Sequence, residues 1–213
     1  ASSKFSDSAG NENADGSDSN NTLTLSVDTV RPTIAITSGA SSLKAGETTT
    51  VTFTLSEAAS DFIEDDISVS GGALSNFAAS SSTVYTATFT PTSDSTTDGV
   101  ISVASSKFSD SAGNENADGS DSNNTLTLSV DTVRPTIAIT SGASSLKAGE
   151  TTTVTFTLSE AASDFIEGDI SVSGGSLSSF SGSGTTYTAT FTPTADSTTN
   201  GVISVASSKF SDA

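Results

Sequence analysis

The chain has 213 residues, of which 25 are acidic and 7 are basic, so its formal net charge is −18. This charge opposes binding to nucleic acids and anionic membrane surfaces, because phosphate contacts require Lys and Arg. The sequence has no His and no Cys, which excludes Ser–His–Asp and Cys–His catalysis, disulfide bonds and Cys zinc sites.

Short runs of alternating apolar and polar residues recur along the chain and predict β-strands. In chain order, one copy of each run reads NTLTLSV, PTIAIT, TVTFTL, DISVS, VYTATFTP and GVISVASSKF, at residues 21–27, 32–37, 50–55, 66–70, 84–91 and 99–108. Ser, Thr, Gly, Asp and Asn fill the segments between the runs, as is typical of turns. Six or seven such strands in a unit predict an all-β fold of antiparallel β-sandwiches, with Thr and Ser on the solvated faces.

The sequence repeats itself at nearly full length. The motif ASSKFSD begins at Ala1, Ala104 and Ala206, and residues 1–67 match residues 104–170 at every position but one. A period of about 100 residues is too long for a solenoid repeat but matches one whole sandwich domain. We therefore predict tandem domains connected like beads on a string.

The sequence DTVRPTIAIT, at residues 28–37 and 131–140, is the predicted boundary between domains. Pro fixes φ, removes a backbone donor and holds its predecessor extended, so it stiffens a short linker. We assign residues 1–28 to the C-terminal strand or strands of a preceding repeat, 29–131 to a complete repeat, and 132–213 to a repeat lacking its last strand.

The two incomplete segments are complementary, because residues 1–28 carry the strand that residues 132–213 lack. The simpler interpretation is a window from a longer repeat array, since the sequence begins in mid-pattern at Ala1. The alternative is strand complementation, in which the N-terminal strand of one copy completes the C-terminal domain of another copy.

Five segments, VDTVRPTIAIT, TVTFTLSEAASDF, DISVSGG, YTATFTPT and FSDSAGNEN, together resemble the bacterial Ig-like repeats of giant RTX-type surface adhesins and biofilm proteins. The resemblance covers essentially the whole chain. It implies tandem Ig-like domains in the extender region of an adhesin that is secreted or carried on the bacterial cell surface, commonly rigidified by calcium at domain junctions. The resemblance does not identify a ligand for these particular units.

Acidic residues from three separate segments of each unit are expected at the end of the sandwich where the preceding linker arrives. Clustered carboxylates repel one another, and Ca²⁺, which takes about six to eight oxygen ligands, would offset this repulsion. With the resemblance, this predicts calcium at both junctions. The candidate ligands are Asp28, Glu57, Asp61, Asp66 and Asp110 at the first junction, and Asp131, Glu160, Asp164, Asp169 and Asp212 at the second. The alternative is that these acids are solvated turn residues.

The loop AGNENADG offers a second candidate calcium site, in which Asn114, Asn116 and Asp118 are followed by Gly119. The spacing N-x-N-x-D-G matches the start of a calcium-binding loop. It departs from an EF-hand, because the first residue is Asn and the Glu at the twelfth position is absent. An Asx-rich hairpin loop without metal is an equally good interpretation.

The predicted function is a structural spacer whose partners are the neighbouring repeats of the same chain. Two alternatives remain open: a fibre subunit assembled from other copies by strand complementation, and a glycan- or cell-binding Ig-like module. A binding module would expose aromatic residues, whereas Tyr85 and Tyr187 lie in strand patterns and are expected in the core.

We do not expect an enzyme. Without His and Cys, the remaining option is glycoside hydrolysis by paired carboxylates, and the sequence has no Trp to line a sugar-binding cleft. No apolar run approaches the roughly 18 residues of a transmembrane helix, so we also expect no direct membrane insertion.

Overall fold

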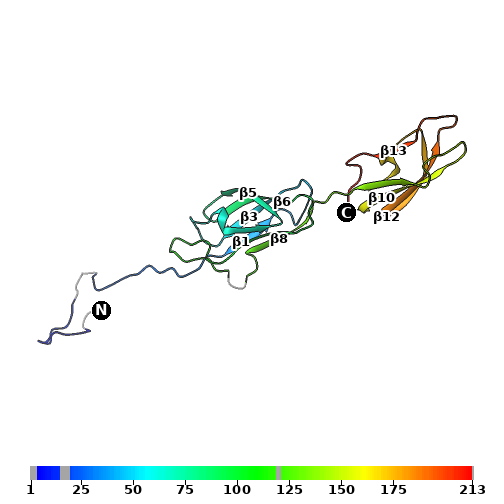
Figure 1. Ribbon diagram of the computed structural model, residues 1–213. Helices are drawn as coiled ribbons and strands as arrows, with labels where there is room; N and C mark the ends of the chain where they lie inside the picture. The colour runs from blue at the N-terminus through cyan, green and yellow to red at the C-terminus, as the bar shows by residue number, and fades with distance from the viewer. Residues whose placement is uncertain (1–3, 15–19, 119–120, 213) are drawn as a thin grey trace.

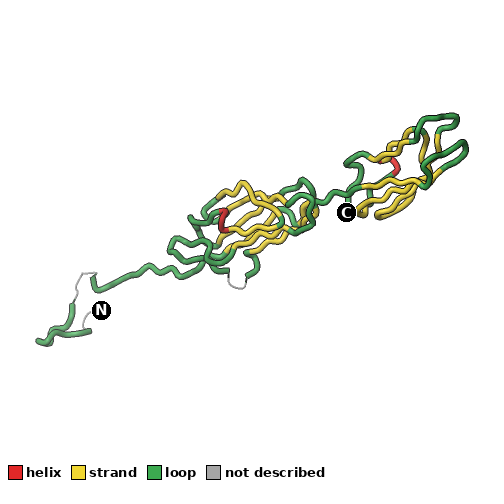
Figure 2. Tube along the Cα trace, in the orientation of Figure 1, coloured by secondary structure: helices red, strands yellow, loops and turns green. Residues whose placement is uncertain are grey.

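The computed structural model describes residues 4–14, 20–118 and 121–212. They form two β-sandwich units in line, preceded by an extended N-terminal segment (Figure 1). Figure 2 shows strands connected by loops in both units. Each unit also contains one short 3-10 turn, Glu64–Asp66 in the first and Glu167–Asp169 in the second. The predicted all-β fold of tandem sandwiches is confirmed.

The first unit packs two four-stranded sheets with the orders β1-β3-β6-β5 and β2-β8-β7-β4. Every neighbouring pair is antiparallel except β2 and β8, which run parallel. The strands are β1 (Ile34–Ser38), β2 (Ser42–Lys44), β3 (Thr49–Leu55), β4 (Ile67–Ser70), β5 (Gly72–Ala79), β6 (Val84–Pro91), β7 (Gly99–Val103) and β8 (Thr125–Asp131).

The second unit has a three-stranded sheet of order β12-β10-β9 and a two-stranded sheet of β11 and β13. Its strands are β9 (Ile137–Ser141), β10 (Thr152–Ala162), β11 (Ile170–Ser173), β12 (Gly175–Pro193) and β13 (Val202–Val205). Strand β12 is long because it continues through the segments that correspond to β5 and β6. Residues 145–147 repeat the sequence of β2 but form no strand.

Inward-facing aromatic rings fill the core of each unit. Phe62 packs edge-on against Tyr85 and Phe108, with ring centroids 5.0 and 5.3 Å apart. Tyr85 is buried, and its hydroxyl donates a hydrogen bond to the carbonyl of Ala59 at 2.9 Å. Tyr187 is buried in the same way in the second unit. The expectation that both tyrosines belong to the core is confirmed.

Two strands of the first unit were missed by the sequence pattern. Strand β2 has only three residues and is held by its parallel pairing with β8. Strand β5 contains a register shift between Ser75 and Ala78, and Asn76 has a φ of 55°. This irregularity interrupts the alternation on which strand prediction depends.

The N-terminal segment differs from its prediction. Residues 22–28 repeat the sequence of β8, yet they form no strand. Leu23, Leu25 and Val27 are 82%, 71% and 75% exposed. A strand needs a neighbour for its backbone hydrogen bonds, and no segment in the described part of the chain pairs with these residues. The strand predicted at 21–27 is therefore absent from the described structure, and the assignment of residues 1–28 to a preceding repeat remains a prediction.

Candidate metal centre

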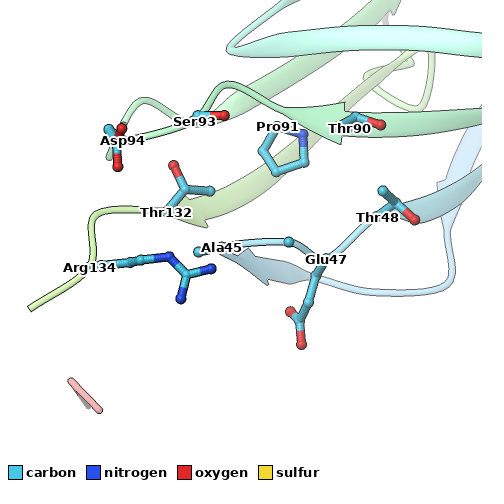
Figure 3. Close-up of a pocket in the computed structure, with 10 residues that line it drawn as sticks. Ala45, Glu47, Thr48, Thr90, Pro91, Ser93, Asp94, Thr132 and Arg134 are labelled. Atoms are coloured by element: carbon cyan, nitrogen blue, oxygen red, sulfur yellow. The ribbon is translucent and has the colours of Figure 1, made fainter. Parts of the chain in front are cut away.

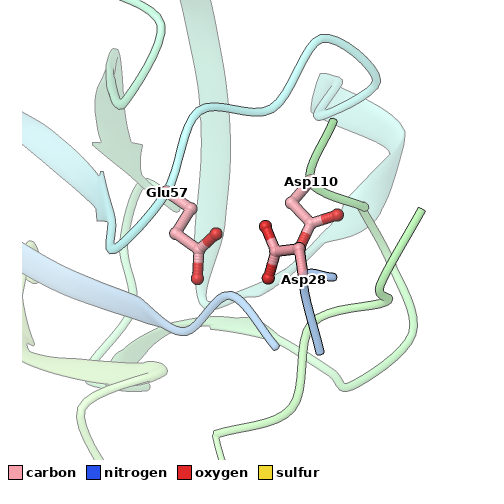
Figure 4. Close-up of side chains that lie close together, drawn as sticks. All are labelled: Asp28, Glu57 and Asp110. Carbon is pink, nitrogen blue, oxygen red and sulfur yellow. The ribbon is translucent and has the colours of Figure 1, made fainter. Parts of the chain in front are cut away.

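Three acidic side chains meet where the N-terminal segment enters the first unit. Asp28, Glu57 and Asp110 each contribute a carboxylate oxygen, and these oxygens lie within 4.8 Å of one another. Figure 4 shows the three side chains converging from separate segments, which are the linker before β1, the loop after β3 and the loop after β7. Within residues 4–14, 20–118 and 121–212, no other acidic group of three is this close.

The three carboxylates differ in their surroundings. Partial burial, together with the charges of Asp28 and Asp110, raises the pKa of Glu57 above its ordinary value. The side-chain amide of Asn114 and nearby backbone N–H groups lower the pKa of Asp110. The lowered pKa favours the ionised form of Asp110, and the negative charge of Asp110 makes the ionisation of Glu57 less favourable than that of an isolated Glu.

A tight turn orients Asp110. Its Oδ1 accepts hydrogen bonds from the backbone N–H groups of Ala112 and Asn114 at 2.8 and 2.9 Å. The side-chain Nδ2 of Asn114 donates to Oδ2 of Asp110 at 2.8 Å and to the backbone carbonyl of Asp28 at 3.3 Å. Asn114 thus connects the linker to the acidic group.

The same turn forms outside the sandwich. Oδ1 of Asp7 accepts from the backbone N–H groups of Ala9 and Asn11, both at 2.9 Å, although this segment is exposed. The sequence S-D-S-A-G-N therefore encodes the turn locally, and docking on a unit is not required.

Asp61 and Asp66, two further predicted ligands of the first junction, form hydrogen bonds within loops and do not join the acidic group. Asp61 accepts hydrogen bonds from the hydroxyl of Ser109 at 2.6 Å and from its backbone N–H at 3.0 Å. Burial opposes the ionisation of Asp61, but these hydrogen bonds outweigh it and lower the pKa. Asp66 accepts from the backbone N–H of Ile63 at 2.9 Å and so caps the helical turn Glu64–Asp66.

The second unit repeats both loop contacts. Asp164 accepts hydrogen bonds from the backbone N–H and the hydroxyl of Ser211 at 3.0 and 2.7 Å, which lower the pKa of Asp164. Asp169 accepts from the backbone N–H of Ile166 at 2.9 Å. These two acids are thus engaged in the same way as their counterparts in the first unit.

The remaining predicted ligands of the second junction, Asp131, Glu160 and Asp212, are not brought within the same distance in the described ranges. Oδ1 of Asp131 accepts from the backbone N–H of Val133 at 3.1 Å.

The side chain of Asn116 connects three backbone groups. It is 0% exposed, and its Oδ1 accepts from the backbone N–H groups of Lys107 and Phe108 at 2.7 and 3.1 Å. Its Nδ2 donates to the carbonyl of Ala104 at 3.0 Å. The oxygen that a metal would use is already hydrogen-bonded twice, which favours the metal-free interpretation of this loop.

Asp118 is buried beside the first strand. It is 6% exposed, and its Oδ1 accepts from the backbone N–H of Ile34 at 2.7 Å. Its Oδ2 has no hydrogen-bond partner among the residues that the structure describes. Gly119, the last residue of the predicted motif, lies outside the described residues. The alternation in N-x-N-x-D is the signal that could have placed Asn116 and Asp118 on the inner face.

Thr132, which no motif in the sequence singles out, fixes the joint between the units. Its hydroxyl donates to the carbonyl of Thr92 at 2.7 Å and accepts from the backbone N–H of Ser95 at 2.9 Å. Its own N–H donates to the carbonyl of Ser95 at 2.9 Å, and the residue is 4% exposed. The linker is therefore attached to the loop after β6.

A pocket of about 310 Å³ adjoins this joint. Figure 3 shows Arg134 of the linker and Glu47 of the loop after β2 lining it, with Asp94 of the loop after β6. Its residues come from the linker and from the first unit, so its shape depends on how Thr132 holds the linker.

Two β-sandwich units, whose strand pairs are antiparallel apart from β2 and β8, joined by a short, hydrogen-bonded linker, define a tandem Ig-like protein. The family model for the bacterial Ig-like domain matches residues 28–127 and 131–213, and the chain belongs to this family. A solved structure of FdeC, described as a broadly conserved Escherichia coli adhesin, is similar with a TM-score of 0.44 and 18% sequence identity. The similarity covers 75% of this chain and 55% of that chain, so this chain spans about half of that one.

No curated protein shows significant sequence similarity to the chain. Within the described residues, no helix has the length and hydropathy that crossing a membrane would require.

Proposed function

We propose that the chain belongs to the extender region of a large extracellular bacterial adhesin of the RTX-type, biofilm-associated kind, where its repeats act as a structural spacer. Such a spacer holds a distal binding domain away from the cell surface. Membership of the bacterial Ig-like family and the near-identity of the repeats support this role. Repetition adds length without adding new chemistry.

The joint at Thr132 carries the proposal. A spacer transmits position only if successive units do not swing freely about their linker. The hydroxyl and the N–H of Thr132 are both bonded to the loop at Thr92 and Ser95, and the side chain is buried. These contacts remove rotational freedom from the first residue after β8.

Calcium at the first junction is part of the proposal. Asp28, Glu57 and Asp110 offer only oxygen ligands, which suit Ca²⁺, and they would be the residues that hold it. Bound Ca²⁺ would supply positive charge that offsets the repulsion acting on Glu57. Because Asp28 belongs to the linker and the other two acids belong to the unit, the ion would attach one to the other.

A binding module is less well supported. Among the described residues, Phe5 is the one exposed large aromatic side chain, at 73% exposure, and both tyrosines are buried. A single exposed ring in the N-terminal segment provides no aromatic patch for a glycan or a cell-surface partner. We propose a structural role without catalysis, since the chain belongs to the bacterial Ig-like family and has no His or Cys to act as base or nucleophile.

The test compares thermal unfolding and solution X-ray scattering of the 213-residue chain in EDTA and in millimolar Ca²⁺. We expect Ca²⁺ to raise the melting temperature and to narrow the distribution of molecular lengths, with the same concentration of Mg²⁺ having less effect. The E57Q variant should lose the response to Ca²⁺. An unchanged melting temperature and an unchanged length distribution would remove calcium from the proposal.

A further inference from the structure

The chain enters and leaves the first unit at opposite ends. At the entry end, Asp28 adjoins Glu57 in the loop after β3. At the exit end, Thr132 is bonded to Ser95 in the loop after β6. Strands β3 and β6 are antiparallel neighbours, so these two loops lie at opposite ends of the unit, as Figure 1 shows. A pull on the two linkers therefore acts along the whole length of the unit.

The strands next to the two linkers run in the same direction. Strand β1 begins at the entry end, where Ile34 lies opposite Leu55, and β8 ends at the exit end with Asp131. Strand β2 follows β1 and runs parallel to β8. Tension draws β1 and β2 toward the entry end and draws β8 toward the exit end. The strands are therefore pulled past one another along their own axes, which is shear.

One edge of β1 is bonded to the segment that leads into β8. The backbone N–H of Ala117 donates to the carbonyl of Pro32 at 3.0 Å, and the N–H of Ile36 donates to the carbonyl of Asn123 at 2.8 Å. Between these two bonds, the N–H of Ile34 donates to Oδ1 of Asp118 at 2.7 Å. The other edge of β1 pairs with β3, so β1 is held on both sides.

Strand β2 adds a second set of contacts nearer the exit end. The backbone N–H of Ser129 donates to the carbonyl of Ser41 at 3.0 Å. Leu43 lies beside Val130 in the parallel pair, and the two side chains are 4% and 3% exposed. We call the two sets together the seam, which joins Pro32, Ile34, Ile36 and residues 41–44 to Ala117, Asp118, Asn123 and residues 129–131.

Water has little access to the bond between Asp118 and Ile34. Asp118 is 6% exposed and Ile34 is 1% exposed, and a hydrogen bond shielded from water is not readily exchanged for one to solvent. The acceptor is a side chain, whereas the neighbouring bonds of the seam join backbone groups. A single substitution at Asp118 can therefore remove one bond of the seam and leave the backbone unchanged.

We propose that the seam keeps the first unit folded while the chain is pulled between its two linkers. Hydrogen bonds between strands lie across the strand axes, so shear strains all the bonds of the seam together. Peeling a strand from one end would strain them one at a time. The rate of unfolding governs forced unfolding, so the seam sets the force that the unit withstands. This proposal goes beyond the spacer function, because it concerns resistance to force, and it requires no metal.

The first test changes the direction of pulling in single-molecule force spectroscopy. The chain has no Cys, so two introduced Cys residues are the sole thiol attachment points. N21C with T136C applies shear to the seam and leaves the second unit outside the path of the force. N21C with S80C pulls at the entry end alone, because the β5–β6 hairpin adjoins the end of β3 through the bond from Leu55 to Thr83.

We expect the N21C/T136C pair to unfold at a force several-fold higher than the N21C/S80C pair, at the same loading rate. Both measurements are made in EDTA, so the result is independent of calcium binding at Asp28, Glu57 and Asp110. Equal forces in the two directions would overturn the proposal.

The second test compares two matched variants in the N21C/T136C background. D118A removes the bond to Ile34, and Y85F removes the bond from the Tyr85 hydroxyl to the carbonyl of Ala59, which lies outside the seam. Asp118 and Tyr85 are both 6% exposed, so each variant loses one buried hydrogen bond. Both should unfold at lower urea concentration than the parent, but D118A alone should lower the unfolding force.

D118N keeps an oxygen that can accept from Ile34, and we expect it to retain most of the force that D118A loses. An unchanged force in D118A, or an equal loss of force in Y85F, would overturn the proposal. A D118N variant as weak as D118A would contradict the role of this acceptor in the seam.

Discussion

Val27 and Val130 occupy the same position in two copies of the sequence TLTLSVD, yet Val27 is 75% exposed and Val130 is 3% exposed. Val130 belongs to β8, which lies between β7 and β2, whereas Val27 has no strand beside it in the described part of the chain. The alternation of the sequence supplies an apolar face, and a neighbouring sheet edge decides whether that face is buried.

This pair of copies gives a matched stability experiment. L128A should lower the free energy of unfolding of the first unit by about 2–5 kcal/mol, because it leaves a cavity at a fully buried position. L25A in the exposed copy should change it by less than about 0.5 kcal/mol. Urea unfolding at low protein concentration measures both, and equal losses would contradict the burial difference.

Asn116 and its counterpart Asn13 offer a second matched comparison of stability. N116A removes the acceptor of two backbone N–H groups and a donor to one carbonyl in the buried loop, so we expect it to cost about 3 kcal/mol or more. Asn13 accepts from the N–H groups of Lys4 and Phe5 in the same way, but it lies outside both sandwich units. N13A should therefore leave the unfolding of either unit unchanged. If Asn116 were chiefly a metal ligand, N116A would be harmless in EDTA.

Asp61 predicts a dependence of stability on pH. The hydrogen bonds from Ser109 lower the pKa of Asp61 in the folded state below its value in the unfolded chain. A group with a lowered folded pKa contributes stability above its unfolded pKa and loses it as the pH falls through the folded pKa. The stability difference between the wild type and D61N should therefore shrink as the pH falls below about 4. Chemical unfolding between pH 7 and 3 measures it, and a constant difference would contradict this assignment.

Thr132 predicts the behaviour of the joint. T132V keeps the shape of the side chain but removes its hydroxyl, so the hydrogen bonds to Thr92 and Ser95 are lost. We expect X-ray scattering to show a broader distribution of lengths, with little change in the stability of either unit. T29V, at the equivalent position of the exposed first copy, should leave the distribution unchanged. A distribution unaffected by T132V would show that other contacts hold the joint.

Much of the fold could be predicted from the sequence, because β1, β3, β4, β6, β7 and β8 alternate cleanly and repeat. Strand β2 escaped prediction because its three residues form a strand only where β8 lies beside them. The segment at 21–27 shows the converse, since it has the pattern but lacks the neighbour. Strand formation here depends on contacts between distant segments, which alternation alone does not encode.

The sequence predicted only part of the candidate site, because the partners of its acidic residues also depend on contacts between distant segments. The topology correctly placed the segments of Asp28, Glu57 and Asp110 at one end of the first unit. It could not show that Asp61 would instead bind Ser109, or that Asp66 would cap a helical turn. Those outcomes depend on which backbone N–H groups are within reach of each carboxylate after folding.

The most direct test of the calcium-stiffened spacer is a Ca²⁺ titration of the 213-residue chain by isothermal calorimetry, with E57Q and E160Q as matched variants. Glu57 lies in the assembled acidic group, and Glu160 is its counterpart where no such group is assembled among the described residues. The account predicts that the wild type binds Ca²⁺, that E57Q weakens binding by about tenfold or more, and that E160Q retains the wild-type affinity. Absence of binding by the wild type, or equal losses in both variants, would contradict it.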